Sequence, residues 1–489
     1  MPWTKDNLKE IVREKVGNHK FLLVSNREPY IHTYAEDGIR WQTPASGMTV
    51  ALDPIMMACG GTWIAAGMGE ADRDVVDGQD HLAVPPGNPS YTLRRVWLTR
   101  DEEEKFYYGY SNEGLWPLCH IVHVRPVFRE SDWQVYREVN EKFAAAVLQE
   151  MGDDSGFVFI QDYHFALLPR LIKNRRPDIV TAQFWHIPWP NPEAFRICPH
   201  AEELLDGLLG NDILGFHIRY HGLNFLDSVD RFLEARIDRE RSSVIRGGRE
   251  TLVRPFPISI DFEAIDRLAR SSAVESRVAR IKQNFRLKDK LVGVGIDRLD
   301  YTKGIVERFL AVDRLLETHP EYRGRFVFLQ LGPLSRIHIL KYKEYNDEIY
   351  HQMVDINDKW MSRSWKPIIL HKEHLGLEEV VSYYRAADVC IVSPIHDGMN
   401  LVAKEFVSSR FDDRGVLLLS QFTGSAREME QALLINPVAT DQFAETIHQA
   451  LSLTPAEQAE RMQKMRAVVM ENNVYRWAGK IINEMKKLM

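Results

Sequence analysis

Residues 291–332 read LVGVGIDRLDYTKGIVERFLAVDRLLETHPEYRGRFVFLQLG, and this stretch decides the fold. A short apolar run at 291–296 is followed by an amphipathic stretch at 305–317 and by a second apolar run at 325–332. Short β-rich runs separated by helical stretches are typical of parallel strands joined by crossover helices. The pattern therefore predicts a βαβ unit, the building block of a doubly wound parallel sheet.

The same alternation continues on both sides of this unit. Downstream, apolar runs begin at residues 367, 388, 415 and 432. Upstream, six runs predict strands of a second α/β domain, and residues 131–149 predict a helix within it. The predicted upstream strands lie in FLLVSN (21–26), TWIAAG (62–67), LRRVWL (93–98), FVFIQDYH (157–164), IVTAQFWHIP (179–188) and DILGFH (212–217).

The proline-containing segment VRPFPISID (253–261) suits an extended connector and fits a helix badly. We place the domain boundary there. The sequence thus predicts an N-terminal domain of residues 1–255 and a C-terminal domain of residues 256–473. An amphipathic stretch at 474–489 closes the chain.

Composition excludes several classes of protein. The chain has 489 residues, of which 45% are hydrophobic and 27% charged, and its formal net charge of −7 argues against general binding to nucleic acids or anionic membranes. Its four cysteines form no C-x-x-C pair, which argues against a zinc ribbon or a disulfide framework. The polar N-terminus lacks the apolar core of a signal peptide, and no apolar run approaches the roughly 18 residues of a membrane span. We expect a cytoplasmic protein.

Several motifs that would identify other enzymes are missing. GVGIDR (293–298) and GMGEAD (67–72) both lack the third glycine of G-x-G-x-x-G, which argues against a nicotinamide dehydrogenase. No phosphate loop of the form G-x-x-x-x-G-K-[ST] and no G-x-S-x-G elbow of a serine hydrolase occurs. The histidine pairs 217/221 and 371/374 lack an evident third ligand. We expect neither a metal nor a cofactor.

Ligands of open α/β sheets bind beyond the carboxyl ends of the strands, so the polar segments that follow the apolar runs are candidate sites. DRLDYTKG (297–304) follows the first run, and its Arg298 and Lys303 could neutralise a diphosphate. A solvated basic loop is the structural alternative.

The segment HDGMNLVAKE (396–405) follows another buried run and looks like the start of a helix. The amides from Met399 to Val402 would be unpaired donors for a diphosphate, and Glu405 could accept hydrogen bonds from two ribose hydroxyls. The structural alternative is an ordinary helix in which Asp397 is only the N-cap.

In the first half, SNREPY (25–30) contains Arg27 and PASGM (44–48) contains Gly47, a combination that suits recognition of a phosphate. QDYH (161–164) and HIPWP (186–190) place Asp162 and His186 among aromatic residues, as in a sugar-binding site. A core aromatic cluster is the favoured alternative for Phe184, Trp185 and Trp189.

In order and spacing, SNREPY, QDYH, HIPWP, DRLDYTKG, DGMNLVAKE and LSQFTGSA (419–426) resemble the trehalose-6-phosphate synthase family of retaining glycosyltransferases, from about Phe21 to about Trp477. The resemblance implies an α/β fold of the GT-B type: two Rossmann-like domains facing across a cleft, with the last helix (474–489) crossing back to the first domain. It also implies transfer of glucose from a nucleotide-glucose, in the first place UDP-glucose, to glucose 6-phosphate. Such an enzyme needs no protein nucleophile, and it could form a homo-oligomer.

The resemblance assigns a role to each matching residue. Catalysis is assigned to Arg298, Lys303, Asp397 and His186. Binding of the nucleotide-sugar donor is assigned to Gly47, Met399, Asn400, Leu401, Val402 and Glu405. Binding of the acceptor phosphosugar is assigned to Arg27, Tyr107, Trp116, Asp162 and Arg336.

Three departures from the family pattern concern the acceptor. Ala66 replaces the second aromatic residue of a W-[FY]-G-W motif, and His396 stands where the family usually has arginine. The NREPY form (26–30) is similar to the related glucosylglycerol-phosphate synthases, which use glycerol 3-phosphate. That acceptor is therefore an alternative. A catalytically inactive sugar-phosphate sensor is another, although it predicts the loss of a charged donor ligand.

Overall fold

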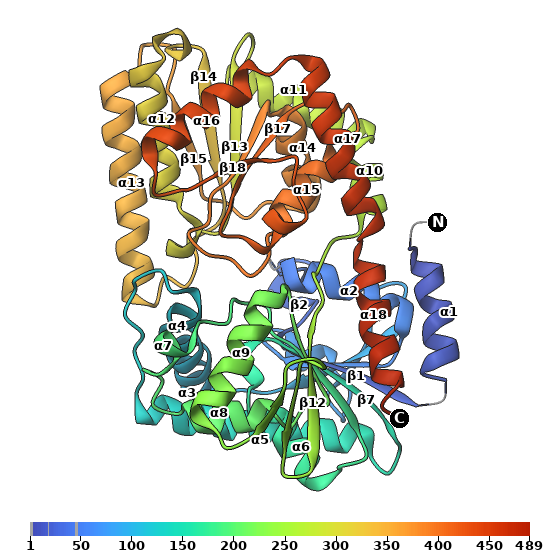
Figure 1. Ribbon diagram of the computed structural model, residues 1–489. Helices are drawn as coiled ribbons and strands as arrows, with labels where there is room; N and C mark the ends of the chain where they lie inside the picture. The colour runs from blue at the N-terminus through green and yellow to red at the C-terminus, as the bar shows by residue number, and fades with distance from the viewer. Residues whose placement is uncertain (1–2, 18, 45–46) are drawn as a thin grey trace. The chain divides into compact units, whose positions relative to one another are not determined.

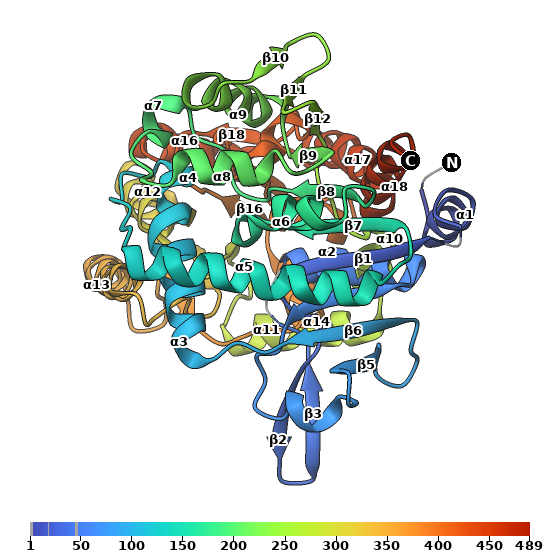
Figure 2. The ribbon, with the colours of Figure 1, turned by 90° about the horizontal axis from the view of Figure 1, so that it is seen from below.

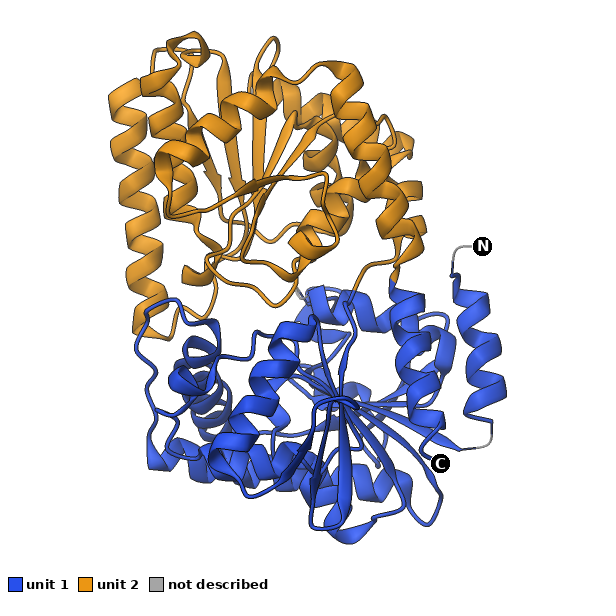
Figure 3. Cartoon of the chain, in the orientation of Figure 1, with its two compact units in different colours: residues 1–258, 474–489 blue, residues 259–473 orange. Residues whose placement is uncertain are grey.

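The computed structural model describes residues 3–17, 19–44 and 47–489. The chain forms two compact units, of which unit 1 comprises residues 1–258 and 474–489 and unit 2 comprises residues 259–473 (Figure 3). The expected connector at 253–261 begins inside a sheet, because Val253 to Pro255 are the end of strand β12 (Arg249–Pro255) and pair with β9 (Ile213–Phe216). The connector prediction is wrong for these three residues, where the ladder of hydrogen bonds outweighs the proline signal.

Unit 2 contains a six-stranded sheet that is parallel throughout (Figure 1). Its spatial order is β15-β14-β13-β16-β17-β18, so the strands follow the 3-2-1-4-5-6 order of a Rossmann fold. The strands are β13 (Leu291–Ile296), β14 (Phe326–Leu331), β15 (Ile368–His371), β16 (Val389–Val392), β17 (Val416–Ser420) and β18 (Leu433–Ile435).

The helices of unit 2 connect these strands. They are α10 (Phe262–Ala269), α11 (Ser272–Asn284), α12 (Ile305–Thr318), α13 (Leu340–Trp360), α14 (Leu377–Ala386), α15 (Leu401–Ser409), α16 (Thr440–Ser452) and α17 (Pro455–Glu471), with 3-10 turns η4 (Tyr301–Lys303), η5 (Pro320–Tyr322) and η6 (Gly424–Arg427). The sequence of α12 explains why this segment forms a helix that packs on the core. Its Ile305, Phe309 and Val312 recur at helical spacing and are fully buried. They pack one face of α12 into the core beside α13 and α16.

Unit 1 contains a ten-stranded sheet of spatial order β10-β11-β12-β9-β8-β7-β1-β4-β6-β5. Its central strands, from β12 to β6, are parallel, whereas β10, β11 and β5 are antiparallel edges. The remaining strands are β1 (Lys20–Arg27), β4 (Thr62–Ala66), β5 (His81–Val84), β6 (Tyr91–Val96), β7 (Gly156–Gln161), β8 (Val180–Phe184), β10 (Arg236–Asp238) and β11 (Ser243–Arg246). Because β4 and β7 flank β1 on opposite sides, the direction of winding reverses there.

The helices of unit 1 are α1 (Lys5–Lys15), α2 (Gly47–Cys59), α3 (Arg100–Glu102), α4 (Trp116–His120), α5 (Glu130–Met151), α6 (Leu168–Arg175), α7 (Pro192–Phe195), α8 (Ala201–Leu208), α9 (Arg219–Phe232) and α18 (Val474–Lys486), with 3-10 turns η1 (Asp72–Val75) and η3 (Tyr163–Phe165). The predicted helix at 131–149 corresponds to α5. None of the helices within the described residues combines the length and apolar character that crossing a membrane requires.

The elements of unit 1 that were not predicted include a hairpin and a π-helix. A hairpin of β2 (Ile31–Ala35) and β3 (Gly38–Gln42) projects from the body of the unit (Figure 2), and its second strand is exposed along its whole length. The second element is a π-helix, η2 (Glu103–Leu115), which contains Tyr107. π-helical turns are rare and occur often at functional sites.

Helix α18 is held in unit 1 by its apolar face. Trp477 is buried, packs against Phe159 and Phe184, and donates a hydrogen bond from Nε1 to the carbonyl of Phe256 at 3.0 Å. Helices α18 and α1 lie side by side (Figure 1). The ring of Trp3 lies so close that a Cβ on Gly479 would come within 2.3 Å of it. The last helix is therefore an integral part of the core of unit 1.

Candidate functional site

The two predicted donor segments of unit 2 meet at the switch point of its sheet. The strand order reverses between β13 and β16, and ligands of such sheets bind beyond the carboxyl ends of the strands at this point. The segment 297–304 follows β13 and the segment 393–400 follows β16. The Nζ of Lys303 lies 2.7 Å from Oδ2 of Asp397, although the two residues are 94 positions apart. The structure thus joins two segments that sequence motifs alone could only suggest.

Lys303 is held as a partly buried cation. Burial alone would lower the pKa of Lys303, but the carboxylates of Asp397, Asp297 and Asp300 outweigh this and raise it. Lys303 therefore carries its positive charge at neutral pH. The turn that positions it ends at Gly304, which has φ 61° and whose Cβ position would lie 2.1 Å from the carbonyl oxygen of Ser393. Only glycine allows this close approach of the turn to the end of β16.

Asp300 organises the predicted cations and was missed from the sequence. Its side chain is fully buried, and its Oδ2 lies 3.6 Å from Nη1 of Arg336, which also bonds to the hydroxyl of Tyr342. Burial would raise the pKa of Asp300, but Arg336, Arg298 and Lys303 together hold it below the usual range. Three predicted site residues thus surround one carboxylate. The sequence did contain a signal for Asp300, because it is the second acidic residue of the motif DRLDYTKG.

Arg336 has φ 46°, which lies in the left-handed region that residues other than glycine rarely adopt. Such strain persists only where the surroundings enforce it, and it is concentrated at functional sites. The contacts with Asp300 and Tyr342 supply that constraint.

The start of helix α15 corrects one interpretation and sharpens another. Asn400, and not Asp397, is the N-cap, because its Oδ1 accepts a hydrogen bond from the amide of Ala403 at 3.0 Å. The amide of Asn400 itself donates to Oγ of Ser425 at 2.8 Å and is already engaged. Leu401 and Val402 are the first helical residues, whose amides have no acceptor within the helix. Of the predicted amide donors, that of Asn400 is engaged, whereas those of Leu401 and Val402 remain available to an anion.

Asp397 is therefore free to act on a ligand. Its Oδ2 accepts hydrogen bonds from Lys303 and, at 3.4 Å, from Nδ2 of Asn400. Within the described residues both contacts end on this one oxygen, which leaves Oδ1 for a further donor. A carboxylate held in this way can bind the hydroxyls of a sugar. His396, where the family usually has arginine, directly precedes it.

Glu405 lies one turn further along α15 and is oriented by a tyrosine. The hydroxyl of Tyr384, which is fully buried in α14, donates to Oε2 of Glu405 at 3.1 Å. Burial raises the pKa of Glu405, and the hydrogen bond from Tyr384 opposes this effect. Tyr384 fixes one oxygen of the carboxylate and leaves the other for a ligand. The sequence offered no sign of this partner.

In unit 1 the predicted residues lie at the switch point around β1. Arg27 is the last residue of β1, and its Nη2 donates to the hydroxyl of Tyr107 at 2.8 Å. Asp162 directly follows the neighbouring strand β7, and its Oδ1 accepts the amide of His186 at 3.1 Å. Asp162 has φ 72°, which is a second strained backbone at a predicted site residue.

His186 is half-buried, and the loss of solvent around its ring lowers its pKa to about 3. It is therefore a neutral imidazole at physiological pH. Its Nε2 lies 2.9 Å from Oε1 of Gln161, so the side chain of Gln161 orients the ring. This arrangement suits a polar contact with a sugar hydroxyl and excludes an imidazolium acid.

The other predicted residues of unit 1 have different surroundings. Gly47, expected in a loop, is the first residue of α2 and is exposed, and residues 45 and 46 of the same motif lie outside the described residues. Trp116 begins α4, with its ring 4.1 Å from that of His120. Phe184, Trp185 and Trp189 each have at most 1% of their surface exposed. The alternative that these three aromatic residues belong to the core is therefore confirmed.

A cavity of 270 Å³ lies beyond the carboxyl ends of β1, β4 and β6. Its lining includes Asn26, Ala66, Met68 and Tyr107. Ala66 is the position at which the family motif carries an aromatic ring, so its small side chain contributes to this space. The partner of Arg27, Tyr107, lies in its wall.

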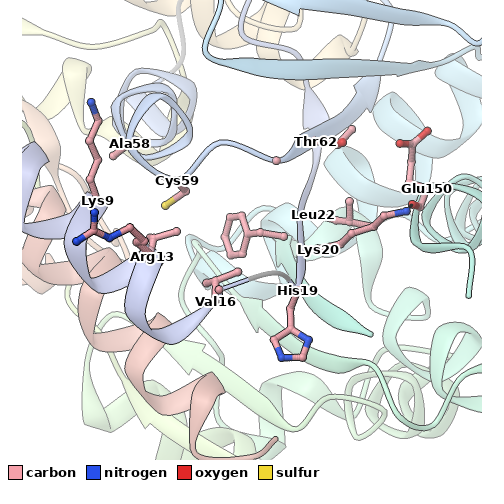
Figure 4. Close-up of a pocket in the computed structure, with 14 residues that line it drawn as sticks. Lys9, Arg13, Val16, His19, Lys20, Leu22, Ala58, Cys59, Thr62 and Glu150 are labelled. Carbon is pink, nitrogen blue, oxygen red and sulfur yellow. Dashed lines mark hydrogen bonds between the residues drawn. The ribbon is translucent and has the colours of Figure 1, made fainter. Parts of the chain in front are cut away.

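A second cavity, of 490 Å³, lies at the opposite end of β1 (Figure 4). Lys9 and Arg13 approach it from α1, and its lining also includes Lys20 and Cys59. None of the predicted site residues lines it. This cavity therefore lies at the amino ends of β1 and β4, opposite to the predicted site.

Glu28 of the NREPY motif has a structural role. Its Oε2 accepts Nε of Arg95 at 2.8 Å, and its Oε1 accepts the amide of Met68 at 2.9 Å, which fixes the segment that lines the smaller cavity. Asp72 lies 2.8 Å from Nη2 of the same arginine. The side chains of all three residues are fully buried. Burial and the hydrogen bond with Asp72 raise the pKa of Glu28 to about 9, so it is protonated at neutral pH.

Glu28→Gln should weaken the pH dependence of stability. An unfolded Glu28 ionises near pH 4.5 and the folded one near pH 9, so between these values the folded state holds one more proton. Stability therefore falls as the pH rises through this window, by up to about 1.4 kcal/mol per pH unit. Glutamine binds no proton and removes this slope. Thermal unfolding of the variant and the wild type at a series of pH values from about 5 to about 8.5 measures the difference.

Glu36→Gln, at an exposed position of the hairpin, is the matched control and should keep the wild-type slope. Equal slopes in the Glu28 variant and the wild type would contradict the assignment of the proton to Glu28.

The comparisons with known proteins agree with this geometry. The sequence profile of glycosyltransferase family 20 matches residues 19–487. The chain belongs to glycosyltransferase family 20. A trehalose-6-phosphate synthase of Mycobacterium marinum is 36% identical to this family-20 enzyme over 484 residues, covering 96% of this chain and 94% of the relative.

Two solved structures resemble the fold of this family-20 enzyme. One is described as trehalose-6-phosphate from E. coli bound with UDP-2-fluoro glucose, with a TM-score of 0.85, 29% identity and coverage of 96% of this chain and 99% of that one. The other is an α,α-trehalose-phosphate synthase (UDP-forming) from Burkholderia xenovorans in complex with glucose-6-phosphate, with a TM-score of 0.85, 28% identity and coverage of 95% and 100%. The predicted family and the α/β fold of the GT-B type, with two Rossmann-like domains, are confirmed.

Proposed function

We propose that this family-20 glycosyltransferase is a trehalose-6-phosphate synthase that transfers glucose from UDP-glucose to glucose 6-phosphate with retention of configuration. The observation that carries the proposal is the contact between Lys303 and Asp397 at the switch point of unit 2. It supports the proposal because a cation that suits a diphosphate lies beside a carboxylate that suits a sugar hydroxyl. The ligands named for the two solved relatives, a UDP-glucose analogue and glucose-6-phosphate, support this choice of substrates.

On this proposal, unit 2 binds the donor. Arg298 and Lys303 neutralise the diphosphate, and the amides of Leu401 and Val402 hydrogen-bond to it at the helix start. Asp397 binds hydroxyls of the transferred glucose. Glu405, oriented by Tyr384, binds the ribose. Each of these residues acts by binding or by charge, so the proposed mechanism requires no protein nucleophile.

Arg27, Tyr107, Trp116 and Arg336 remain proposed acceptor-binding residues. Asp162 and neutral His186 would bind sugar hydroxyls. The cavity beside Tyr107 would hold part of the acceptor. Gly47 and Met399 remain proposed donor contacts.

The proposed reaction breaks the bond between C1 of glucose and the diphosphate oxygen, and forms a bond from the acceptor hydroxyl oxygen to the same carbon on the same face. The acceptor proton passes to the departing phosphate oxygen. The enzyme accelerates this exchange by orienting the two substrates and by stabilising negative charge on the leaving group through Lys303, Arg298 and the helix amides.

Product analysis tests the proposal. The enzyme is incubated with UDP-, ADP- or GDP-glucose and with glucose 6-phosphate or glycerol 3-phosphate, and the products are identified by mass and by the NMR coupling of the anomeric protons. We expect trehalose 6-phosphate from UDP-glucose and glucose 6-phosphate, with both anomeric centres α. Formation of glucosylglycerol phosphate alone, or no transfer with any pair, would overturn it in favour of the alternative acceptor or of a sensor.

Glu405→Gln should raise the KM for the nucleotide-glucose about 10- to 100-fold, because a hydrogen bond to a charged carboxylate contributes about 1.5–3 kcal/mol. Its kcat should change little, since ribose binding is equal in the ground state and the transition state. Initial rates at varied donor concentration separate the two constants. Glu430→Gln, at an exposed position, is the control and should match the wild type. A fall in kcat with an unchanged KM would contradict this role.

A further inference from the structure

Three potential metal ligands gather in unit 2, on elements that carry none of the predicted donor ligands. His319 directly follows α12, and Glu445 and His448 lie one turn apart on α16, which packs against α12. One ligand atom from each residue can be chosen such that all three lie within 4.8 Å of one another. Because Lys303 lies two residues before the start of α12, the helix separates it from His319 by about 21 Å at 1.5 Å per residue. The cluster is thus distinct from the proposed substrate site.

Contacts within the cluster bring the three side chains together. Nε2 of His319 lies 3.0 Å from Oε2 of Glu445. The imidazole rings of His319 and His448 stack, with centroids 3.9 Å apart and an angle of 13° between their planes. A carboxylate and two imidazoles form a strong ligand set for a divalent cation.

Each histidine is also oriented through its other ring nitrogen. Nδ1 of His448 lies 2.9 Å from the hydroxyl of Tyr322, and Nδ1 of His319 lies 3.3 Å from Oε1 of Glu321. Histidines that bind metals almost always engage the second nitrogen in this way, which fixes the tautomer and leaves Nε2 for the metal. Both orienting residues belong to the same turn, η5. This second set of contacts distinguishes the cluster from a chance grouping on the surface.

We propose that His319, Glu445 and His448 bind one Zn²⁺ through the two Nε2 atoms and a carboxylate oxygen. Two histidines and one glutamate form a known ligand set for zinc, with water in the fourth, open position. The stacked rings must splay slightly so that their lone pairs converge, and the torsion that turns a histidine ring is soft. Glu445 is largely exposed, so the metal reaches the site from solvent.

The bound ion would join the end of α12 and the turn η5 to α16. It would therefore act as a clamp on the helices of unit 2, with no part in glucosyl transfer. Zinc would take the place of the direct contact between Nε2 of His319 and Oε2 of Glu445.

The test is metal binding by the full chain after chelator treatment. Isothermal titration with Zn²⁺ should show one saturable equivalent, and Co²⁺ should give the visible absorption of a site with few ligands, which Zn²⁺ then displaces. His319→Asn and His448→Asn should each weaken binding about 100-fold or more, and Tyr322→Phe about tenfold or more, because it removes only an orienting contact. Zn²⁺ should also raise the thermal midpoint of the wild type and not of the two histidine variants.

His374→Asn is the matched control, an exposed histidine of the HKEH segment (371–374). It should bind Zn²⁺ as the wild type does. Thermal unfolding of the metal-free variants verifies that each is folded. The proposal is overturned if the wild type shows no saturable equivalent, if both histidine variants bind as the wild type does, or if the control variant loses binding equally.

Discussion

Lys303→Ala should lower kcat about 10²- to 10³-fold, which corresponds to about 3–4 kcal/mol of transition-state stabilisation. Negative charge grows on the leaving diphosphate as the bond to glucose breaks, and the raised pKa of Lys303 keeps a cation in place for it. The contact with Asp397 holds the ammonium group before the substrate arrives, so little reorganisation is needed during the reaction. The effect should fall on kcat more than on the KM of the donor.

Steady-state kinetics and single-turnover rates measure this loss. Removal of Lys303 also leaves Asp397, Asp297 and Asp300 with less compensating charge, so the variant should be verified by thermal unfolding and by binding of the nucleoside diphosphate. Lys288→Ala, at an exposed position, is the control and should keep the wild-type rate. Unchanged turnover in a folded Lys303 variant would refute the proposed stabilisation of the leaving group.

Trp477→Ala should destabilise unit 1 by about 3–5 kcal/mol, the range found when a buried tryptophan or phenylalanine is removed from a core. The side chain is buried against Phe159 and Phe184, and the carbonyl of Phe256 would lose its donor. Calorimetry should show an earlier thermal transition. Because the chain has two units, we expect two thermal transitions. Only the transition of unit 1 should move to lower temperature.

Two further variants separate the causes. Trp477→Phe keeps most of the apolar surface and loses the hydrogen bond, so it should cost less than the alanine variant. Lys487→Ala, at an exposed position near the end of the chain, should have no measurable effect. A Trp477→Ala protein with both transitions unchanged would show that α18 contributes little to the core.

The sheets could be predicted from the sequence because their parallel strands are buried on both faces. Such strands consist almost entirely of apolar residues, and the runs at 291–296 and 388–394 contain β13 and β16. The hairpin β2–β3 gave no such signal, since its second strand is exposed along its length. The π-helix η2 differs from an α-helix in its hydrogen-bond register, which apolar periodicity does not reveal.

The site was predicted as a set of segments, and the structure supplied their connections. Lys303 and Asp397 belong to separate motifs, and no local pattern states that their side chains meet. Tyr384 was missed because its contact with Glu405 depends on the packing of α14 on α15. The N-cap was placed at Asp397 in the structural alternative, whereas Asn400 provides it, since helix starts are set by the hydrogen bond to the first turn. Glu28 shows that a motif residue can be structural.

The interrupted path of unit 1 also constrains how the protein is made. Residues 259–473 are translated as one continuous stretch, so unit 2 can close on the ribosome as soon as that stretch has emerged. Unit 1 must wait for residues 474–489, which arrive last and include Trp477. During that interval, apolar surface around Phe159 and Phe184 lacks its cover. The N-terminal half is therefore the half that completes its folding second, and the interval before α18 docks is when the nascent chain is most exposed to aggregation and to chaperones.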